Sequence, residues 1–432
     1  MSYADHLVLR NVWVSSFVLS LSLFGDALLY VILPVHADAF GVSLAMVGFL
    51  LAINRIIRTF AYGVIVEIAE RIGLKKLCVI AATTAVVSTL GYTILDGAFW
   101  LSLSRALWGL SYAALLLITL SYAAINPAKT GTRIGLSRSV EQIGPLLAMT
   151  AGAWLATIVG PKTVFGYLAV ASSLAVLLAF FLFENVQPNT IKRPAKRDRL
   201  LPRPDSLDVM IFWMGAGIDG VFTLSISLMW AEHVSLELAI LLGGSILAAR
   251  RLSEMLVAPF AGVIADRFGT RLPLTIAVVA SILGFAMIGG DWLSAGSCLL
   301  VISRGALGTL FAAAVAKIYQ DSKIKALARN QTWRDIGAAA GPLAAGAALT
   351  ILSPELLHIG LAAAFSLAFL WFLRSPGFKT FSAAGVAGTV GSAIVKEFRN
   401  DDPTTYLSNE DQQKNMLVDM VTQPISEDMT RP

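Results

Sequence analysis

Two aspartates interrupt apolar segments of the chain at related positions. Asp26 lies in residues 11–35, which hold no other charged residue, and Asp219 follows 193 residues later in "GIDGVF". Two arginines, Arg105 and Arg304, interrupt apolar segments 199 residues apart. A carboxylate in apolar surroundings is costly unless it takes up a proton or meets a positive charge. Each aspartate is therefore a candidate to bind and release a proton as its access to water changes, and an arginine inside a membrane helix must face a cavity or a carboxylate.

The composition shows what surrounds such a site. Of 432 residues, 56% are hydrophobic and 14% are charged, and the mean hydropathy is +0.72. Soluble proteins are about 25% charged, so lipid must be the solvent for much of this chain. Twelve segments are long and apolar enough to span a bilayer. We predict membrane helices at 11–36, 43–66, 77–96, 99–124, 135–159, 163–184, 208–231, 236–262, 272–290, 293–316, 333–352 and 356–374.

Several functional classes lack their motifs. There is no Gly-Lys-Ser/Thr phosphate loop, no His-Glu-x-x-His and no Gly-x-Ser-x-Gly. Cys78 and Cys298 both lie in predicted helices without metal-ligand spacing. We therefore expect no enzyme activity, no cofactor and no bound metal. The first apolar run is too long for a cleaved signal peptide and is interpreted as the first membrane helix.

The placement of basic residues predicts the topology. With the N-terminus inside, the cytoplasmic loops hold Arg10, Arg71, Lys75, Lys76, Lys129, Arg133, Arg267, Arg271, Lys317, Lys323, Lys325 and Arg329, whereas the opposite loops hold only Lys162. This asymmetry follows the positive-inside rule. It places both termini in the cytoplasm of a cell, most simply at a bacterial inner membrane, and explains the net charge of +5 without nucleic acid as a partner.

The chain is predicted to consist of two related halves. A first bundle of six helices covers 1–184 and a second covers 208–375, separated by a basic, proline-rich cytoplasmic linker at 185–207; an acidic tail at 376–432 is predicted to be disordered. "AERIGLKK" and "ADRFGTRL" are 196 residues apart, "LSLSRALWG" and "LVISRGALG" 199, and "IGPLLA" and "AGPLAA" 197. Repeats at nearly one offset indicate pseudo-symmetric bundles.

Residues 10 to about 375 resemble the major facilitator superfamily, whose loop motif is Gly-x-x-x-Asp-Arg-x-Gly-x-Arg/Lys. The second half matches it, and the first half matches it except that Val66 replaces the leading glycine. The resemblance implies a gate formed by the motif and the starts of the fifth and eleventh helices, with Glu70 near Arg334 and Asp266 near Arg138. The gating residues are Glu70, Arg71, Gly73, Lys75, Gly262, Asp266, Arg267, Gly269, Arg271, Arg138 and Arg334.

Two further motifs bear on the mechanism. Leu-x-x-x-Arg-x-x-x-Gly contains Arg105 and Arg304, and in proton-driven exporters that resemble this chain the arginine of the fourth helix is tied to proton coupling. Gly144-Pro145 and Gly341-Pro342 resemble the fifth-helix motif of drug:proton antiporters, but Ala148 and Met149 replace its glycine pair. Antiport is thus mildly favoured, and a role in kinking and packing the helix is an equal alternative.

Other charged residues lie inside predicted helices. Arg58 and Glu141 are secondary candidates for a central cavity. The remainder are expected to pair where the two halves meet; they are Arg55, Arg250, Arg251, Glu254 and Asp335. In the family that the chain resembles, the first, fourth, seventh and tenth helices line the cavity, which would bring Asp26, Arg105, Asp219 and Arg304 together.

The sequence therefore predicts a secondary active transporter of a small solute or ion, coupled to protons and working by alternating access. Two alternatives remain open. The first is a metal-cation or iron carrier of a specialised bacterial membrane such as the magnetosome membrane, since two acids suit a cation. The second is a membrane scaffold with a degenerate transporter fold, acting through a protein partner of the tail.

The topology is testable with cysteines introduced at Lys162→Cys and Lys196→Cys in a background without native cysteines. Because Lys162 is the lone basic residue of the outer loops, an impermeant thiol reagent should label it on intact cells and leave position 196 unlabelled. Labelling of position 196 alone would invert the assignment.

Overall fold

The computed structural model describes residues 3–184, 202–375 and 378, and these belong to one compact unit, Met1–Phe381. Helices form all of the regular structure in this part of the chain. Most of the predicted linker and nearly all of the predicted tail lie outside the described residues, so the structure does not test their state.

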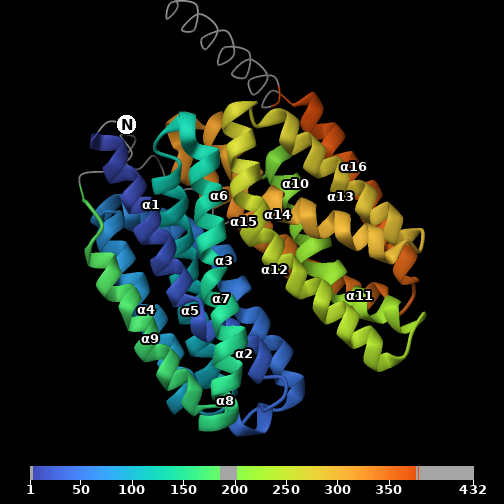
Figure 1. Ribbon diagram of the computed structural model, residues 1–432, viewed down its shortest axis with the longest axis horizontal. Helices are drawn as coiled ribbons and strands as arrows, with labels where there is room; N and C mark the ends of the chain where they lie inside the picture. The colour runs from blue at the N-terminus through green and yellow to red at the C-terminus, as the bar shows by residue number, and fades with distance from the viewer. Residues whose placement is uncertain (1–2, 185–201, 376–377, 379–432) are drawn as a thin grey trace, which may run out of the picture. The chain divides into compact units, whose positions relative to one another are not determined.

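The first half of the chain forms the helices that Figure 1 colours from blue to green. They are α1 (Tyr3–Ser22), α2 (Phe24–Ile32), η1 (Ala37–Phe40), α3 (Leu44–Ile72), α4 (Leu74–Ile94), α5 (Ala98–Ala123), η2 (Pro127–Lys129), α6 (Thr130–Glu141), α7 (Ile143–Leu147), η3 (Ala148–Gly152), α8 (Ala153–Val159) and α9 (Thr163–Phe180).

The second half follows in yellow-green to red. Its elements are α10 (Ser206–Met214), η4 (Gly215–Val221), α11 (Phe222–Ala231), α12 (Leu236–Arg267), α13 (Arg271–Gly289), α14 (Leu293–Ile318), η5 (Gln320–Ser322), α15 (Lys323–Ala348) and α16 (Pro354–Arg374).

Helices occupy all twelve segments for which membrane helices are predicted. Ten spans within the described residues are long and apolar enough to cross a bilayer. The other two segments form α12 and α15, which are long but more polar. The start of α15 at Lys323 corrects the predicted start at 333, and α1 begins at Tyr3 rather than near residue 11. Hydropathy misses these first turns because they are polar and lie at one end of the bundle.

Three of the twelve helices are irregular, and two of the irregularities contain the aspartates. The first helix is interrupted at Leu23, which places Asp26 in the first turn of α2. The seventh helix passes through a π-helical segment, η4, which contains Asp219. The fifth contains another π-helical segment, η3. Breaks and π-helical turns recur at functional sites because they free backbone groups and redirect side chains.

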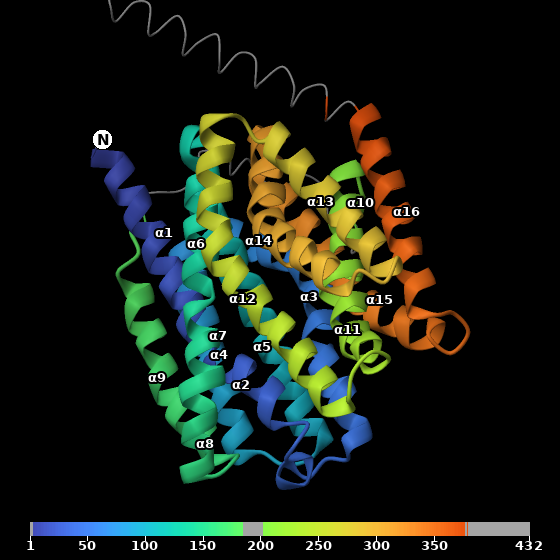
Figure 2. The ribbon, with the colours of Figure 1, turned by 45° about the vertical axis from the view of Figure 1, so that its right-hand side comes forward.

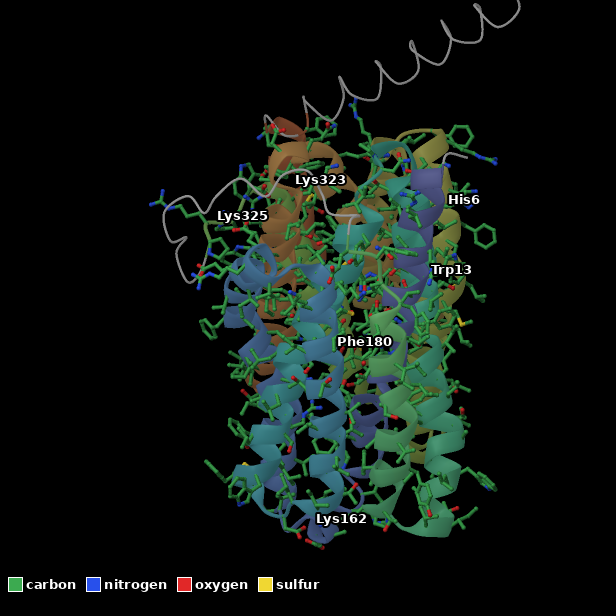
Figure 3. The ribbon with its side chains drawn as sticks, turned by 90° about the vertical axis from the view of Figure 1, so that its left-hand side faces the viewer. His6, Trp13, Lys162, Phe180, Lys323 and Lys325 are labelled. Carbon is green, nitrogen blue, oxygen red and sulfur yellow. The ribbon has the colours of Figure 1, made fainter. Side chains whose placement is uncertain are left out.

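The two halves meet mainly along two pairs of helices. One is α6 with α12, which run side by side in Figure 2, and the other is α3 with α15. Gly131 and Gly262 bring the first pair together, since a Cβ on Gly262 would lie 2.1 Å from the Gly131 carbonyl oxygen. Gly131 is in the first turn of α6, and Lys323 donates to the Ala124 carbonyl shortly before that helix, so the contact lies near Lys323. Figure 3 shows His6, Lys323 and Lys325 toward one end of the unit and Lys162 at the other. We call these the Lys323 end and the Lys162 end.

The two Gly-Pro motifs mark close helix approaches at equivalent places. A Cβ on Gly144 would lie 1.9 Å from the Ser20 carbonyl oxygen of α1, and one on Gly341 would lie 2.3 Å from the Ala216 carbonyl oxygen of η4. Small residues permit such contacts between membrane helices. The motifs therefore fix the fifth helix against the first and the eleventh against the seventh, beside the two irregular segments.

This packing predicts that Gly144→Ala and Gly341→Ala each destabilise the protein by about 1–3 kcal/mol, because backbone atoms must move apart. Gly346 is the matched control on α15, since nothing lies within 4 Å of its Cβ position. Gly346→Ala should be neutral or stabilising by up to about 1 kcal/mol, as expected for alanine in a helix. Melting temperatures in detergent measure all three variants. Equal values for Gly144→Ala and Gly346→Ala would contradict the close approach.

Candidate functional site

Asp26 is paired with Arg105 of α5. The Arg105 guanidinium donates to Asp26 Oδ1 in an ion pair, and Asn54 Nδ2 donates to the same oxygen at 3.3 Å. The Arg105 side chain is fully buried, whereas that of Asp26 is 14% exposed. Arg105 also donates to two carbonyls of α3, those of Leu50 at 2.9 Å and Leu51 at 3.2 Å. The arginine is thus held in place by groups other than the carboxylate.

Asp219 has a more strongly positive environment. Arg304 of α14 contributes Nε at 2.7 Å from Asp219 Oδ1 and Nη2 at 3.2 Å from Oδ2. Arg334 of α15 donates to Oδ2 at 3.2 Å, and Arg250 of α12 lies 3.5 Å from Oδ1. Asp219 therefore contacts three guanidinium groups, and one of them, that of Arg304, also lies 3.6 Å from Glu254.

The two sites are related by the repeat but differ in two positions, since Arg334 contacts Asp219 whereas Arg138, 196 residues before it, pairs with Glu141. Arg250 stands 196 residues after Asn54, the residue that contacts Asp26. The first half thus contributes a neutral amide where the second half contributes a charge. No sequence pattern singles out Asn54, because an asparagine in an apolar helix can serve many purposes.

A cavity of about 40 Å³ lies between the halves, next to Arg304. Its lining residues are Tyr112, Arg138, Glu141, Gln142, Ile211, Met214, Arg251, Glu254, Arg304, Gly305, Gly308, Gln331 and Arg334. Of the residues proposed from the sequence, Arg304, Arg334, Arg138 and Glu141 line it. Asp219 touches two of these arginines, whereas Asp26 and Arg105 do not line the cavity.

A polar network crosses this cavity from one half to the other. Arg138 is bonded to Glu141 at 2.9 Å. Gln142 of the first half donates to Glu254 at 3.1 Å and accepts from Arg251 at 3.3 Å. The cavity wall is therefore formed jointly by α6 and α12.

Arg58, predicted as a candidate for the cavity, does not line the cavity described above. Its guanidinium lies 3.1 Å from Asp335 across the contact between α3 and α15, and Tyr62 donates to the same carboxylate at 3.0 Å. The prediction for Arg58 was wrong because the sequence does not show that Asp335, one residue after Arg334, turns toward the other half.

The loop motif of the second half contacts the start of α6. Asp266 accepts backbone hydrogen bonds from Gly131 at 2.9 Å and Thr132 at 2.7 Å, the positive end of a helix. Lys317 lies 3.5 Å from Asp266 and donates to Thr270 at 2.9 Å. The resemblance placed Arg138 beside Asp266, but Arg138 lies further along α6 and pairs with Glu141.

The first-half motif differs from the expectation. Arg334 contacts Asp219, and among the described residues no ion pair joins it to Glu70. The expected neighbourhood was wrong because Arg334 lies three turns into α15 rather than at its start. Gly73 and Gly269 have positive φ of 85° and 83°, a conformation that favours glycine and turns the chain between helices. Arg71, Arg267 and Arg271 are exposed and Lys75 is half-buried.

A further pair of ionic contacts repeats between the halves at the Lys323 end. Asp5 pairs with Arg133, and Asp205 pairs with Arg329, which follows Arg133 by 196 residues. The sequence pattern identified Arg133 and Arg329 as basic loop residues but not the aspartates with which they pair. These pairs hold the first and fifth, and the seventh and eleventh, helices together outside the cavity.

The described residues contain no group of three or more His, Cys, Asp and Glu side chains placed to hold a metal ion. In addition, the two aspartates that suggested a cation carrier are bound to arginines.

Comparison with solved structures supports one fold. The human organic anion transporter TETRAN aligns with a TM-score of 0.69 and 16% identity over 86% of this chain and 100% of that one. The proton:xylose symporter XylE, bound to 6-bromo-6-deoxy-D-glucose, aligns with a TM-score of 0.69 and 14% identity over 86% of this chain and 96% of that one. The E. coli fucose:proton symporter FucP aligns with a TM-score of 0.65 and 11% identity over 87% of this chain and 100% of that one.

At the level of sequence, no curated protein matches the chain. The family model described as Major Facilitator Superfamily matches residues 15–249, more than half of the chain. Together with the helical spans and the shared fold, this match shows that the chain is an integral membrane protein that belongs to the major facilitator superfamily.

Proposed function

We propose that this protein is a secondary active transporter that moves a small solute through a bilayer in exchange for, or together with, protons. Membership of the superfamily supports transport. The observation that supports proton coupling is the Asp26–Arg105 pair, a partly exposed carboxylate on a broken helix bound to a fully buried arginine.

Asp26 is better suited than Asp219 to gain and lose a proton. When Asp26 is neutral, Arg105 keeps the carbonyls of Leu50 and Leu51 as hydrogen-bond acceptors. Protonation of Asp219 would instead leave three guanidinium groups without their shared carboxylate. Nearby positive charges favour the ionised form of an acid. We therefore assign proton exchange to Asp26 and a fixed negative charge to Asp219.

The transport cycle proposed here is a rocking of two bundles, 1–184 and 208–375, about their contact. The closed contacts of α6 with α12 lie at the Lys323 end, which the positive-inside rule assigns to the cytoplasm. Both termini and the linker at 185–207 would then be cytoplasmic, most simply at a bacterial inner membrane.

Symport, in which solute and proton move in the same direction, has more support than antiport. XylE and FucP are both named proton symporters. Antiport rests on the Gly-Pro motif alone, and the close contacts of Gly144 and Gly341 explain that motif by packing. The scaffold alternative has no supporting observation within the described residues.

Asp26→Asn tests the proton assignment. The amide keeps the shape and a hydrogen bond to Arg105 but cannot carry a proton, so uptake driven by a pH gradient should fall at least about tenfold, a loss of about 1.4 kcal/mol or more of coupling. Exchange without a gradient should persist. The measurement is uptake into proteoliposomes of a solute found by thermal-shift screening. Accumulation equal to that of the parent would exclude Asp26 as the coupling residue.

Asp219→Asn is the matched comparison. Because it removes the carboxylate shared by the buried Arg304 and the partly buried Arg250 and Arg334, it should destabilise the fold by about 3–5 kcal/mol, the usual effect of leaving buried charge unpaired. Melting temperatures of the two variants separate the roles. A stable Asp219→Asn protein without gradient-driven uptake would move the proton site to Asp219.

Asp266→Asn tests the closed contact at the Lys323 end. Loss of its charge should weaken the bonds to the start of α6, so a cysteine at Met214 in the cavity should react severalfold faster with an impermeant reagent applied to inside-out vesicles. Arg267→Gln, at an exposed neighbour in the same motif, is the control. Equal rates in Asp266→Asn and Arg267→Gln would show that Asp266 does not close the cavity.

A further inference from the structure

Positive charge exceeds negative charge in the middle of the helices. Eight arginines lie there: Arg55, Arg58, Arg105, Arg138, Arg250, Arg251, Arg304 and Arg334. The carboxylates at the same depth are five: Asp26, Glu141, Asp219, Glu254 and Asp335. Each ion placed inside a bilayer is costly unless it is compensated. An excess of arginine at this depth is therefore a feature that needs a compensating anion.

Part of this excess can be assigned to two particular side chains. Arg55 and Arg251 are 196 residues apart, at equivalent places on the second and eighth helices. Among the described residues no carboxylate forms an ion pair with either of them. Arg55 donates to the Ala338 carbonyl at 2.7 Å, and Arg251 donates to the neutral Gln142 side chain at 3.3 Å. Of the two, only Arg251 lines the cavity.

The cavity is positive as a whole. Four arginines and two glutamates line it, with arginine contributed by both halves: Arg138 from α6, and Arg251, Arg304 and Arg334 from the second half. Arg138 lines the cavity, and its buried Nε has no hydrogen-bond acceptor among the described residues. The volume of about 40 Å³ has room for roughly three water-sized groups. That space fits the charged end of a small molecule.

We infer that the transported solute is a small organic anion, and that Arg251 and Arg138 bind its carboxylate between the two halves. This inference rests on the proposed transport function and names the substrate class of that same site. The planar guanidinium of arginine matches a carboxylate with two parallel hydrogen bonds. An anion bound here bridges α6 and α12, and it adds negative charge beside Arg251, whose neighbour Glu254 is engaged by Arg304 and Gln142.

The test measures melting temperature with charge-matched probes. Lactate, succinate and citrate are compared at equal ionic strength with the neutral succinamide and the cationic putrescine. At least one carboxylate should raise the melting temperature of the parent protein by about 2 °C or more, through binding to the folded state. The same carboxylate should have no such effect on Arg251→Gln, a comparison that removes general salt effects on stability.

The protein without added probe gives a second measurement. Arg251→Gln should melt close to the temperature of the parent, because Arg251 forms no direct ion pair within the described part of the chain and its neighbour Glu254 keeps its contact with Arg304. Arg58→Gln is the matched control; it should melt several degrees lower, since it leaves Asp335 buried without its arginine. If Arg251→Gln is as destabilised as Arg58→Gln, or if no carboxylate distinguishes the parent from Arg251→Gln, the inference is wrong.

The outcomes separate this inference from the proposed function. Uptake of a neutral or cationic solute driven by a pH gradient would overturn the anion site and leave proton-coupled transport intact. Stabilisation by a carboxylate that depends on Arg251, with no uptake of that carboxylate into proteoliposomes, would support the anion site and overturn the transport function.

Discussion

The cost of holding a charge inside a bilayer determines how this molecule is built. Lipid exposure of one arginine or aspartate at the centre of a helix costs at least about 2.5–3.5 kcal/mol, so each charge must face a partner inside the bundle. Asp26 faces Arg105, and Asp219 faces Arg304. The breaks in the first and seventh helices place both aspartates at irregular turns. The glycine contacts that pack the fifth and eleventh helices against them exclude lipid from these turns.

The same repeat has produced two sites with different chemistry. Asn54 leaves Asp26 with one arginine, whereas Arg250 at the equivalent place gives Asp219 one of its three. The low dielectric inside the bundle makes the interaction between each aspartate and its arginines stronger than it would be in water. A carboxylate with one well-supported arginine is suited to exchange a proton, and one shared by three arginines is suited to stay ionised. In our interpretation the first half carries the proton and the second half, with α6, carries the anion.

The sequence predicted the helices because hydropathy is a local property, and it predicted the repeat because related motifs recur at a nearly constant spacing along the chain. The resemblance implied that Asp26, Arg105, Asp219 and Arg304 meet at one cavity, whereas they form two separate ion pairs, and of the four only Arg304 lines the cavity between the halves. The sequence did not predict that Arg58 pairs with Asp335, that Arg334 reaches Asp219 rather than Glu70, or that Arg138 turns to Glu141. Those choices depend on the rotation of each helix about its own axis, which close packing sets and which the pattern of residue types leaves undetermined.

Infrared difference spectroscopy of the purified protein between two pH values tests the central claim most directly, because the C=O stretch of a protonated carboxylic acid reports the group that takes up the proton. If Asp26 is the group that exchanges the proton, the parent should show a protonated carboxyl band that appears as the pH falls. This band should be absent in Asp26→Asn. Retention of the full band in Asp26→Asn would contradict the assignment of the proton to Asp26.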